Sequence, residues 1–320
     1  MFLDISNLSK SYKKGLPLIK KLNFSVKKGE IISFIGESGS GKTTLLKCIA
    51  GLEKINDGRI ILNGLVLNDD RVFIKPQRRK IGFIFQDYPL FPHLTLKENI
   101  IFNLDKTYFK NLSYMLNLTK LEKLVSRYPH ELSGGEQQRA CIARSLIREP
   151  ELLLMDEPFS NLDSSIKGFM IDEIYKILKQ TETTTILVTH DIKDSLNISD
   201  KILVFKAGLL QQYADPLKIY CEPVNCYCAR VIGGLNKIII DGKVCYVRPE
   251  NVKVVKKSRF KVLVEKCYYQ GGDFKVKGFI ENEPCFFTSK NPIKSSSYVF
   301  IDFNKKDLMV FDSLCESYFE

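Results

Sequence analysis

The sequence has no long apolar run and no leader-like start. No stretch approaches the ~18 uninterrupted apolar residues that would span a bilayer. The first residues, MFLDISNLSKSYKK, have no basic segment followed by an apolar core and a small-residue cleavage site, so we expect no secretory signal. Both absences favour a cytosolic protein that does not cross a membrane by itself.

The sequence also has no even, regularly spaced set of cysteines. Its nine cysteines are scattered from Cys48 to Cys315, which is typical of reduced thiols rather than a disulfide framework. Three of them form a cluster at Cys221, Cys226 and Cys228, but this C-x4-C-x-C spacing matches no common zinc or iron–sulfur pattern and no histidine is near. We therefore expect packed free thiols there rather than a metal site.

Length and charge set the broad class. A chain of 320 residues is long enough for one large and one small domain. The net charge of +11 suggests an anionic partner such as nucleic acid or lipid headgroups. However, residues 236–320 hold 15 Lys and Arg against 11 Asp and Glu, so the excess is spread over both parts of the chain. A solvated basic surface is favoured, and no nucleic-acid partner is expected.

Apolar strands alternate with helices through most of the chain. EIISFIG and ELLLMDE each contain a short buried strand, and TTTILVTH contains a third. Helical spacing follows in TTLLKCIAGL, closed by Gly51, and in DSSIKGFMIDEIYKILKQ, whereas KILVFKAGLLQQY predicts a hairpin at Ala207 and Gly208. The alternation predicts an α/β fold with a largely parallel sheet, helices on both faces, and a helical insertion over residues 87–132.

The pattern changes after about residue 234. From there the residues alternate with period two and are broken by Gly, Asp and Asn turns, without a helical pattern. We predict two domains: a nucleotide-binding domain over residues 1–234 and a small all-β barrel or sandwich over residues 235–320, joined near Gly233 and Gly234.

GESGSGKT fits the phosphate-loop pattern G-x-x-x-x-G-K-[ST] and lies between a predicted strand and a predicted helix. Its glycines let backbone N–H groups converge on phosphate oxygens, and the helix adds its positive dipole end. Lys42 would reach the β- and γ-phosphates, and Thr43 would offer its hydroxyl to Mg²⁺. A Gly-rich structural turn is the alternative, but chance gives this pattern in roughly 1% of such chains. The expected nucleotide-binding residues are Gly36, Ser38, Gly39, Ser40, Gly41, Lys42, Thr43 and Thr44.

Three other strands end in polar side chains. Asp156 and Glu157 end a buried strand, so we expect Asp156 to hold Mg²⁺ and Glu157 to polarise the attacking water as a general base. His190 ends another strand and would orient the γ-phosphate, and Gln86, ending IGFIFQ, would meet metal or water. Alone, two acids can simply cap a strand and a histidine can be a bystander; beside a phosphate loop the catalytic interpretation is favoured.

SGGEQQRACIAR presents a second set of glycines ahead of a helix. Ser133, Gly134 and Gly135 could bind a γ-phosphate, but the nucleotide of this chain already has its loop. We call the phosphate loop the first cradle and Ser133–Gly135 the second cradle; a second cradle is useful only if it binds a second nucleotide. The expected arrangement is a two-fold homodimer in which each chain covers the nucleotide held by the other.

These motifs resemble the ATP-binding subunits of ABC transporters over essentially the whole chain. GESGSGKT resembles Walker A, LLLMDE Walker B, LSGGEQQR the signature, and SNLD, residues 160–163, the D-loop; Gln86 and His190 match the Q-loop and the switch histidine. Tyr12 falls where the family stacks an aromatic ring on adenine. The signature has Glu136 where Gln is commonest, and the D-loop has Asn161 where Ala is usual. The resemblance implies that the partner chain's nucleotide is contacted by Ser133, Gly134, Gly135, Gln137 and Asp163.

DPLKIYCEP and a β-rich tail containing VRPENV are similar to importer ATPases with a C-terminal OB-like (TOBE) domain. This implies an Mg²⁺-dependent ATPase at the cytoplasmic face of the membrane. It would work beneath a separate permease, which the insertion segment FPHLTLKENI would contact, and with an extracytoplasmic solute-binding protein. The short tail favours an inorganic ion such as ferric iron, or a polyamine, as the solute. The alternatives are a soluble ABC ATPase acting on nucleic acid or ribosomes, and an exporter ATPase.

Overall fold

A computed structural model describes residues 1–13 and 16–312. Cys315 therefore lies outside the described residues. The chain divides into two compact units, Met1–Lys218 and Ile219–Glu320. This division falls earlier than the boundary near residue 234 that the sequence predicts. That the nucleotide-binding domain extends over residues 1–234 stays a prediction.

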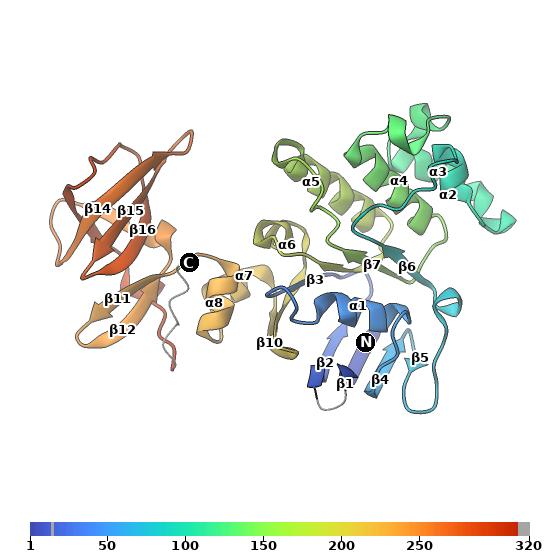
Figure 1. The fold of residues 1–320 in the computed structure, drawn as a ribbon, viewed down its shortest axis with the longest axis horizontal. Helices are drawn as coiled ribbons and strands as arrows, with labels where there is room; N and C mark the ends of the chain where they lie inside the picture. The colour runs from blue at the N-terminus through green and yellow to red at the C-terminus, as the bar shows by residue number, and fades with distance from the viewer. Residues whose placement is uncertain (14–15, 313–320) are drawn as a thin grey trace. The chain divides into compact units, whose positions relative to one another are not determined.

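The first unit is built on a six-stranded sheet that is parallel except at one edge (Figure 1). Its strand order is β10-β9-β3-β8-β7-β6, and β10 alone pairs antiparallel within it. The predicted parallel sheet is confirmed. In spatial order the strands are β10 (Leu209–Ala214), β9 (Lys201–Lys206), β3 (Ile31–Ile35), β8 (Thr184–Val188), β7 (Leu152–Asp156) and β6 (Ile81–Ile84).

A second, antiparallel sheet belongs to the same unit. Its order is β2-β1-β4-β5, from Leu16–Val26, Leu3–Lys13, Asp57–Leu62 and Leu65–Asn68. DGRIILNG is thus a strand, as predicted, but β4 pairs antiparallel with β1. The expectation of helices on both faces of the parallel sheet is confirmed, because α1 (Lys42–Ala50) packs on one face and the remaining helices pack on the other. The second sheet, which shares the face of α1, was not predicted. The sequence signal was weak because bulges break the alternation along β1 and β2.

Alternate side chains of the central strands enter two separate cores. On β7, Leu152 and Leu154 pack in one core with α1 and the antiparallel sheet, whereas Leu153 and Met155 pack in the other with the remaining helices. All four are fully buried, and burying one such side chain contributes roughly 1.5–3 kcal/mol. The helices are α1 (Lys42–Ala50), α2 (Leu96–Ile101), α3 (Leu112–Leu118), α4 (Gly134–Leu146), α5 (Ser164–Gln180) and α6 (Ile192–Ile198).

The hairpin between β9 and β10 turns at Ala207 and Gly208, as predicted. Both residues have positive φ, 46° and 81°. A Cβ on Gly208 would lie 2.2 Å from the carbonyl oxygen of Leu18, so this turn requires glycine for space as well as for conformation. The hairpin is thereby held against β2, where Lys20 N–H donates to the Gly208 carbonyl at 2.9 Å.

One short helix starts just before the second unit and ends within it, and a second short helix follows. The described residues after 234 form two antiparallel sheets, which confirms their predicted all-β character. The helices are α7 (Pro216–Cys221) and α8 (Cys226–Ile232). A hairpin joins β11 (Asn236–Ile240) to β12 (Lys243–Val247). A five-stranded sheet has the order β13-β17-β14-β15-β16, from Lys253–Val255, Tyr298–Asp302, Phe260–Tyr269, Phe274–Ile280 and Glu283–Ser289.

Arg248, buried within the second unit, explains why α8 groups with the β strands. Its guanidinium donates to the carbonyls of Ala229 at 2.7 Å, Tyr220 at 3.1 Å and Gly234 at 3.3 Å. The side chain is only 2% exposed. One arginine after β12 therefore satisfies carbonyls from the helical segment and from the link that follows it.

The expectation of packed free thiols at the cysteine cluster is wrong at two of its three positions. Cys226 is disulfide-bonded, and Cys221 is exposed rather than packed; Cys228 is buried. An odd number of cysteines argues against a framework but leaves room for one bond. No three His, Cys, Asp or Glu side chains gather as a metal site within residues 1–13 and 16–312. In the same ranges no helix is long and apolar enough to cross a membrane.

Candidate active site

The phosphate-loop segment connects β3 to α1, as the sequence predicts. Three of its glycines, Gly36, Gly39 and Gly41, have positive φ. Gly41 is the N-cap of α1 and supplies no side-chain hydrogen bond to the first turn. Because the first N–H groups of a helix have no partner within it, this end of α1 is available to an anion.

Gly36 is required by a close approach between two strands. A Cβ at this position would lie 2.0 Å from the carbonyl oxygen of Phe205, at the end of β9. Its φ of 150° also lies in the region that L side chains rarely adopt. The start of the loop is therefore fixed by the neighbouring strand and tolerates no side chain.

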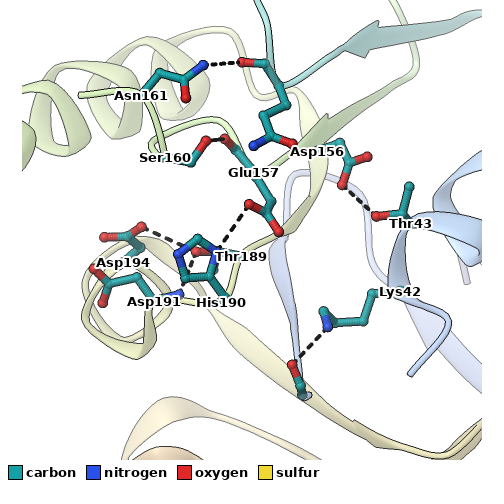
Figure 2. A network of polar contacts seen from close by, with 12 residues as sticks. Lys42, Thr43, Asp156, Glu157, Ser160, Asn161, Thr189, His190, Asp191 and Asp194 are labelled. Carbon is teal, nitrogen blue, oxygen red and sulfur yellow. Dashed lines mark hydrogen bonds and ion pairs between the residues drawn. The ribbon is translucent and has the colours of Figure 1, made fainter. Parts of the chain in front are cut away.

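Lys42 folds back across the loop (Figure 2). Its ammonium donates to the carbonyls of Gly36 at 2.8 Å and Glu37 at 2.7 Å, and the residue is 7% exposed. Desolvation lowers the pKa of Lys42, against the opposing charges of Glu157 and Asp156. A partly desolvated cation held among glycines is a suitable partner for phosphate oxygens.

The two acids, Asp156 and Glu157, differ in backbone conformation and in the contacts of their side chains. Asp156 ends β7, and its carboxylate accepts from the Thr43 hydroxyl at 2.9 Å. Burial raises the pKa of Asp156, partly offset by this hydrogen bond and by nearby lysines. Glu157 follows with φ 46°, a left-handed conformation, and its N–H donates to the Val188 carbonyl at 2.9 Å. This turn directs the Glu157 side chain to the region of His190 (Figure 2).

His190 comes from the loop between β8 and α6. Its Nδ1 lies 3.1 Å from Oε2 of Glu157, and its side chain is 66% exposed. The same loop is anchored by Lys167 on α5, which pairs with Asp191 at 2.6 Å and Asp194 at 3.0 Å. The ion pairs of Lys167 thus anchor the loop that carries an accessible imidazole beside the Glu157 carboxylate.

Gln86 lies beyond its strand rather than at its end. The prediction that the strand includes Gln86 is wrong, because β6 stops at Ile84. Gln86 is exposed, and its backbone carbonyl accepts from the Asn161 amide at 3.1 Å. The short strand therefore leaves Gln86 in a connecting segment, tied to the residues that precede α5.

A hollow of about 410 Å³ brings many of the predicted residues together. Besides Leu18, it is lined by Ser38, Gly39, Gly41, Lys42, Thr43, Thr44, Glu157 and His190. Tyr12, Gln86 and Asp156 do not line it. Tyr12 is 59% exposed and lies under the ammonium of Lys10, 4.8 Å from the ring centre. Residues from the phosphate loop and from two different strand ends thus open onto one space.

The second predicted phosphate-binding segment is capped by a residue of its own chain. Ser133 is the N-cap of α4 and forms a capping box with Glu136. The Ser133 hydroxyl donates to the Glu136 carboxylate at 2.9 Å and the Ser133 N–H donates at 2.7 Å. Burial works to raise the pKa of Glu136, but these hydrogen bonds and nearby arginines lower it. The carboxylate is therefore charged at neutral pH.

The other residues of the second cradle are separate from the hollow. Gln137 donates to the carbonyls of Pro129 at 3.0 Å and Leu132 at 3.1 Å, which ties the start of α4 to the segment before it. Asp163 is the exposed N-cap of α5 and makes no side-chain cap. Ser133, Gly134, Gly135, Gln137 and Asp163 are all absent from the lining of the hollow.

Sequence reasoning missed the residues that support His190. Asp191 has a local signal, because it is the N-cap of α6 and accepts from the Lys193 N–H. Lys167 has no such signal, since its pairing with Asp191 and Asp194 joins α5 to α6 across the fold. Contacts of this kind follow from tertiary packing and not from spacing.

Comparison with known proteins adds to this geometry. Residues 19–160 match the family described as ABC transporter. The sn-glycerol-3-phosphate import ATP-binding protein UgpC of Psychromonas ingrahamii is 33% identical, over 85% of this chain and 80% of that protein. The spermidine/putrescine import ATP-binding protein PotA of Haemophilus ducreyi is 35% identical, over 82% and 75%. The maltose/maltodextrin import ATP-binding protein MalK of Mannheimia succiniciproducens is 37% identical, over 79% and 68%.

Solved structures agree with the fold over about two thirds of the chain. The dimeric, post-hydrolysis ATP-binding cassette MJ0796 bound to ADP and phosphate matches with a TM-score of 0.57 and 32% identity, over 67% of this chain and 98% of that one. CbiO1 of Clostridium perfringens, part of the transporter complex cbiONQ, matches with a TM-score of 0.63 and 29% identity, over 69% and 91%. With the phosphate loop, the paired acids and the histidine in place, this chain belongs to the ABC transporter family and is an importer-type ATP-binding subunit.

Proposed function

We propose that this chain is the Mg²⁺-dependent motor of an importer, hydrolysing ATP as a homodimer at the cytoplasmic face of a membrane. The observation that carries the proposal is the hollow of about 410 Å³ onto which Lys42, Glu157 and His190 open together. A cation for phosphate, a carboxylate for water and an imidazole beside it are the groups that phosphoryl transfer to water requires.

The chemistry assigned to the site is in-line attack of water on the γ-phosphorus. The water oxygen forms a bond to phosphorus as the bond to the β–γ bridging oxygen breaks, giving ADP and phosphate. Glu157 accepts the proton of the water, and His190, 3.1 Å from it, orients the γ-phosphate. Lys42 and the N–H groups at the start of α1 stabilise the charge that develops on the phosphate oxygens.

The residues around Asp156 fit a magnesium ion. The carboxylate of Asp156 and the hydroxyl of Thr43 lie 2.9 Å apart, and both are oxygen ligands of the kind that Mg²⁺ prefers. Burial raises the pKa of Asp156, so a cation there would relieve the cost of holding a desolvated carboxylate. Gln86 is proposed as a further ligand. When bound, the metal neutralises charge on the β- and γ-phosphates.

The second cradle supports the proposed homodimer. Ser133, Gly134 and Gly135 begin α4 outside the hollow, so they serve an anion only if it belongs to another chain. Gln137 and Asp163 are proposed to face the same partner nucleotide. The relative bound to ADP and phosphate is itself described as dimeric. Tyr12 is proposed to stack on the adenine of its own chain.

A separate groove supports a permease partner. It has a volume of about 600 Å³, and its lining combines aromatic rings with cations. Among the lining residues are Phe83, Phe91, Phe102, Arg144 and Arg148. Phe91 belongs to FPHLTLKENI, the insertion segment. Apolar anchors with arginines around them suit a short helix of another protein.

The proposed solute is a polyamine or an inorganic ion such as ferric iron, delivered by an extracytoplasmic binding protein. A relative named for spermidine and putrescine import supports the first of these. Other relatives are named for glycerol-3-phosphate and maltose import. The choice depends on the permease and the binding protein, so identifying the solute retained by the purified complex would decide it.

Glu157→Gln tests the proposed function. The change removes the proton acceptor and keeps the shape, so ATP should still bind while turnover falls by at least about 100-fold. The ATP-bound variant should then elute as a dimer in size-exclusion chromatography, and with ADP as a monomer. Wild-type turnover in this variant, or an ATP-bound form that stays monomeric, would overturn the proposal.

A further inference from the structure

One backbone carbonyl, that of Pro158, accepts two hydrogen bonds from distant segments. The Tyr88 hydroxyl donates to it, and so does the Gln138 amide at 2.7 Å. Tyr88 is 5% exposed and Gln138 is fully buried. Because Pro158 has no N–H, this carbonyl is the only backbone group through which its own residue can be held by hydrogen bonds.

Pro158 directly follows Glu157, whose backbone is strained. Glu157 has φ 46°, a left-handed conformation that is unfavourable for a residue with a Cβ. The conformation is fixed on one side by the bond from Glu157 N–H to Val188, and within its own turn by Ser160, whose hydroxyl donates to the Glu157 carbonyl at 3.0 Å. The two donors on Pro158 fix the other side.

The two donors come from segments that belong to two different proposed sites. Tyr88 is two residues after Gln86, and it is followed by Pro89 and Phe91, which line the 600 Å³ groove. Gln138 lies on α4, five residues after the N-cap Ser133. The carbonyl of Pro158, next to the proposed general base Glu157, is thus linked through Tyr88 to the groove and through Gln138 to the second cradle.

Gln138 is held in an unusual way for a buried amide. Its Nε2 donates to Pro158, whereas its Oε1 has no hydrogen-bond partner among the described residues. Leaving a buried acceptor unpaired destabilises the folded state, because the acceptor has lost its hydrogen bonds to water. An apolar residue of similar size would avoid that cost, so packing alone does not account for the amide.

We propose that Tyr88 and Gln138 are positioning residues that hold the Glu157 carboxylate where it can accept the proton of water. Tyr88 links this position to the groove, and Gln138 links it to the second cradle at the start of α4. This inference rests on the proposed function, in which Glu157 accepts the proton of water. Both side chains act through the Pro158 peptide and touch no substrate. Misplacing a catalytic group by about 1 Å can cost about 100-fold in rate, so losing one of two bonds is expected to lower kcat by about tenfold.

The test compares Tyr88→Phe with a matched control. Tyr88→Phe removes the hydroxyl and keeps the ring, so kcat for ATP should fall about tenfold with the ATP dissociation constant unchanged and the melting temperature within about 4 °C. Gln138→Met should act in the same direction. Tyr114→Phe, at a tyrosine that is 57% exposed, should leave kcat at the wild-type value.

The decisive measurement is single-turnover hydrolysis in a Glu157→Gln background. If Tyr88 acts through Glu157, adding Tyr88→Phe to Glu157→Gln should produce no further loss of rate. A further tenfold loss there, or a wild-type kcat for Tyr88→Phe alone, overturns the inference while the proposed function stands. Wild-type turnover by Glu157→Gln itself overturns the proposed function, and this inference with it.

Discussion

The two glycine-containing segments of this chain look alike in sequence and differ in structure. The phosphate-loop segment from Gly36 to Lys42 leaves the start of α1 without a side-chain cap and bends back onto its own lysine. The segment at Ser133 begins α4 with a complete capping box, in which Glu136 accepts from the serine N–H and hydroxyl. The start of α1 has no side-chain cap, whereas the start of α4 has its serine occupied by the carboxylate of Glu136.

This difference shows how one chain can contain one phosphate-binding site that is complete by itself and a second that is not. The first cradle already has its cation, since Lys42 lies within 2.8 Å of the loop carbonyls. At the second, Ser133 donates to the charged Glu136, and the nearby Arg127 and Arg139 partly offset that negative charge. A nucleotide held elsewhere, with its charge already neutralised, suits the second cradle better than a free nucleotide does.

Adding a methyl group to the first cradle is the strongest way to break the comparison. Gly36→Ala places a Cβ 2.0 Å from the Phe205 carbonyl and in a disfavoured φ region, so β3 and β9 must separate. We expect a loss of about 3 kcal/mol in the free energy of unfolding. ATP binding should weaken by at least about tenfold, measured by equilibrium titration.

Gly168→Ala is the matched control for that change. Gly168 lies within α5, and a Cβ there would meet nothing within 4 Å. Alanine in a helix interior is favoured over glycine by about 0.5–1 kcal/mol, so this variant should melt higher and bind ATP normally. Equal losses of stability and of ATP affinity in the two variants would mean that Gly36 is no more important for either than Gly168.

The first cradle could be predicted because its signals are local. A buried run, three glycines, a lysine and a helical pattern occur within twenty consecutive residues, and each constrains its neighbours. The hairpin at Ala207 and Gly208 was predictable for the same reason. The antiparallel sheet of β1, β2, β4 and β5 was not, because the pairing of β1 with β4 joins distant segments and bulges break the alternation along β1 and β2.

The second cradle was predictable as a helix start, but the contacts that join α4 to the rest of the fold were not. Ser133 followed by Glu136 three residues later is a capping box, which the sequence displays openly. The Tyr88 and Gln138 contacts with Pro158 are invisible in the sequence, because their donors come from segments far from the acceptor in the chain. Side-chain bonds to a distant carbonyl depend on how the helical insertion packs on the sheet.

Removing the charge of Asp156 sharpens the account of the first cradle. Because burial raises the pKa of Asp156, the folded protein holds a proton there more tightly than the unfolded chain does. Stability is therefore lost as pH rises from the ordinary aspartate pKa of about 3.9 through the raised value. Asp156→Asn should melt higher than wild type at pH 7 without nucleotide, and the advantage should disappear at lower pH.

The same variant should lose its response to magnesium and ATP. Wild type should gain about 2.7 kcal/mol at a ligand concentration about 100 times the dissociation constant, and Asp156→Asn should gain far less. Asp70→Asn, whose side chain is 79% exposed, is the control and should respond as wild type does. Thermal melting with and without Mg²⁺ and ATP measures both effects, and a variant that melts lower at pH 7 would contradict the desolvation argument.

The smallest change, Glu136→Gln, examines the second cradle alone. Glutamine can still accept from the Ser133 N–H, so the capping box and the stability should stay within about 0.5 kcal/mol of wild type. Removing a negative charge next to Ser133 should, however, favour the partner's γ-phosphate. In a Glu157→Gln background we expect the ATP-bound dimer to tighten about threefold at low salt and less at about 1 M salt, where charges are screened. Sedimentation at several protein concentrations measures this; a dimer that loosens, or a gain that ignores salt, would show that Glu136 does not face a phosphate.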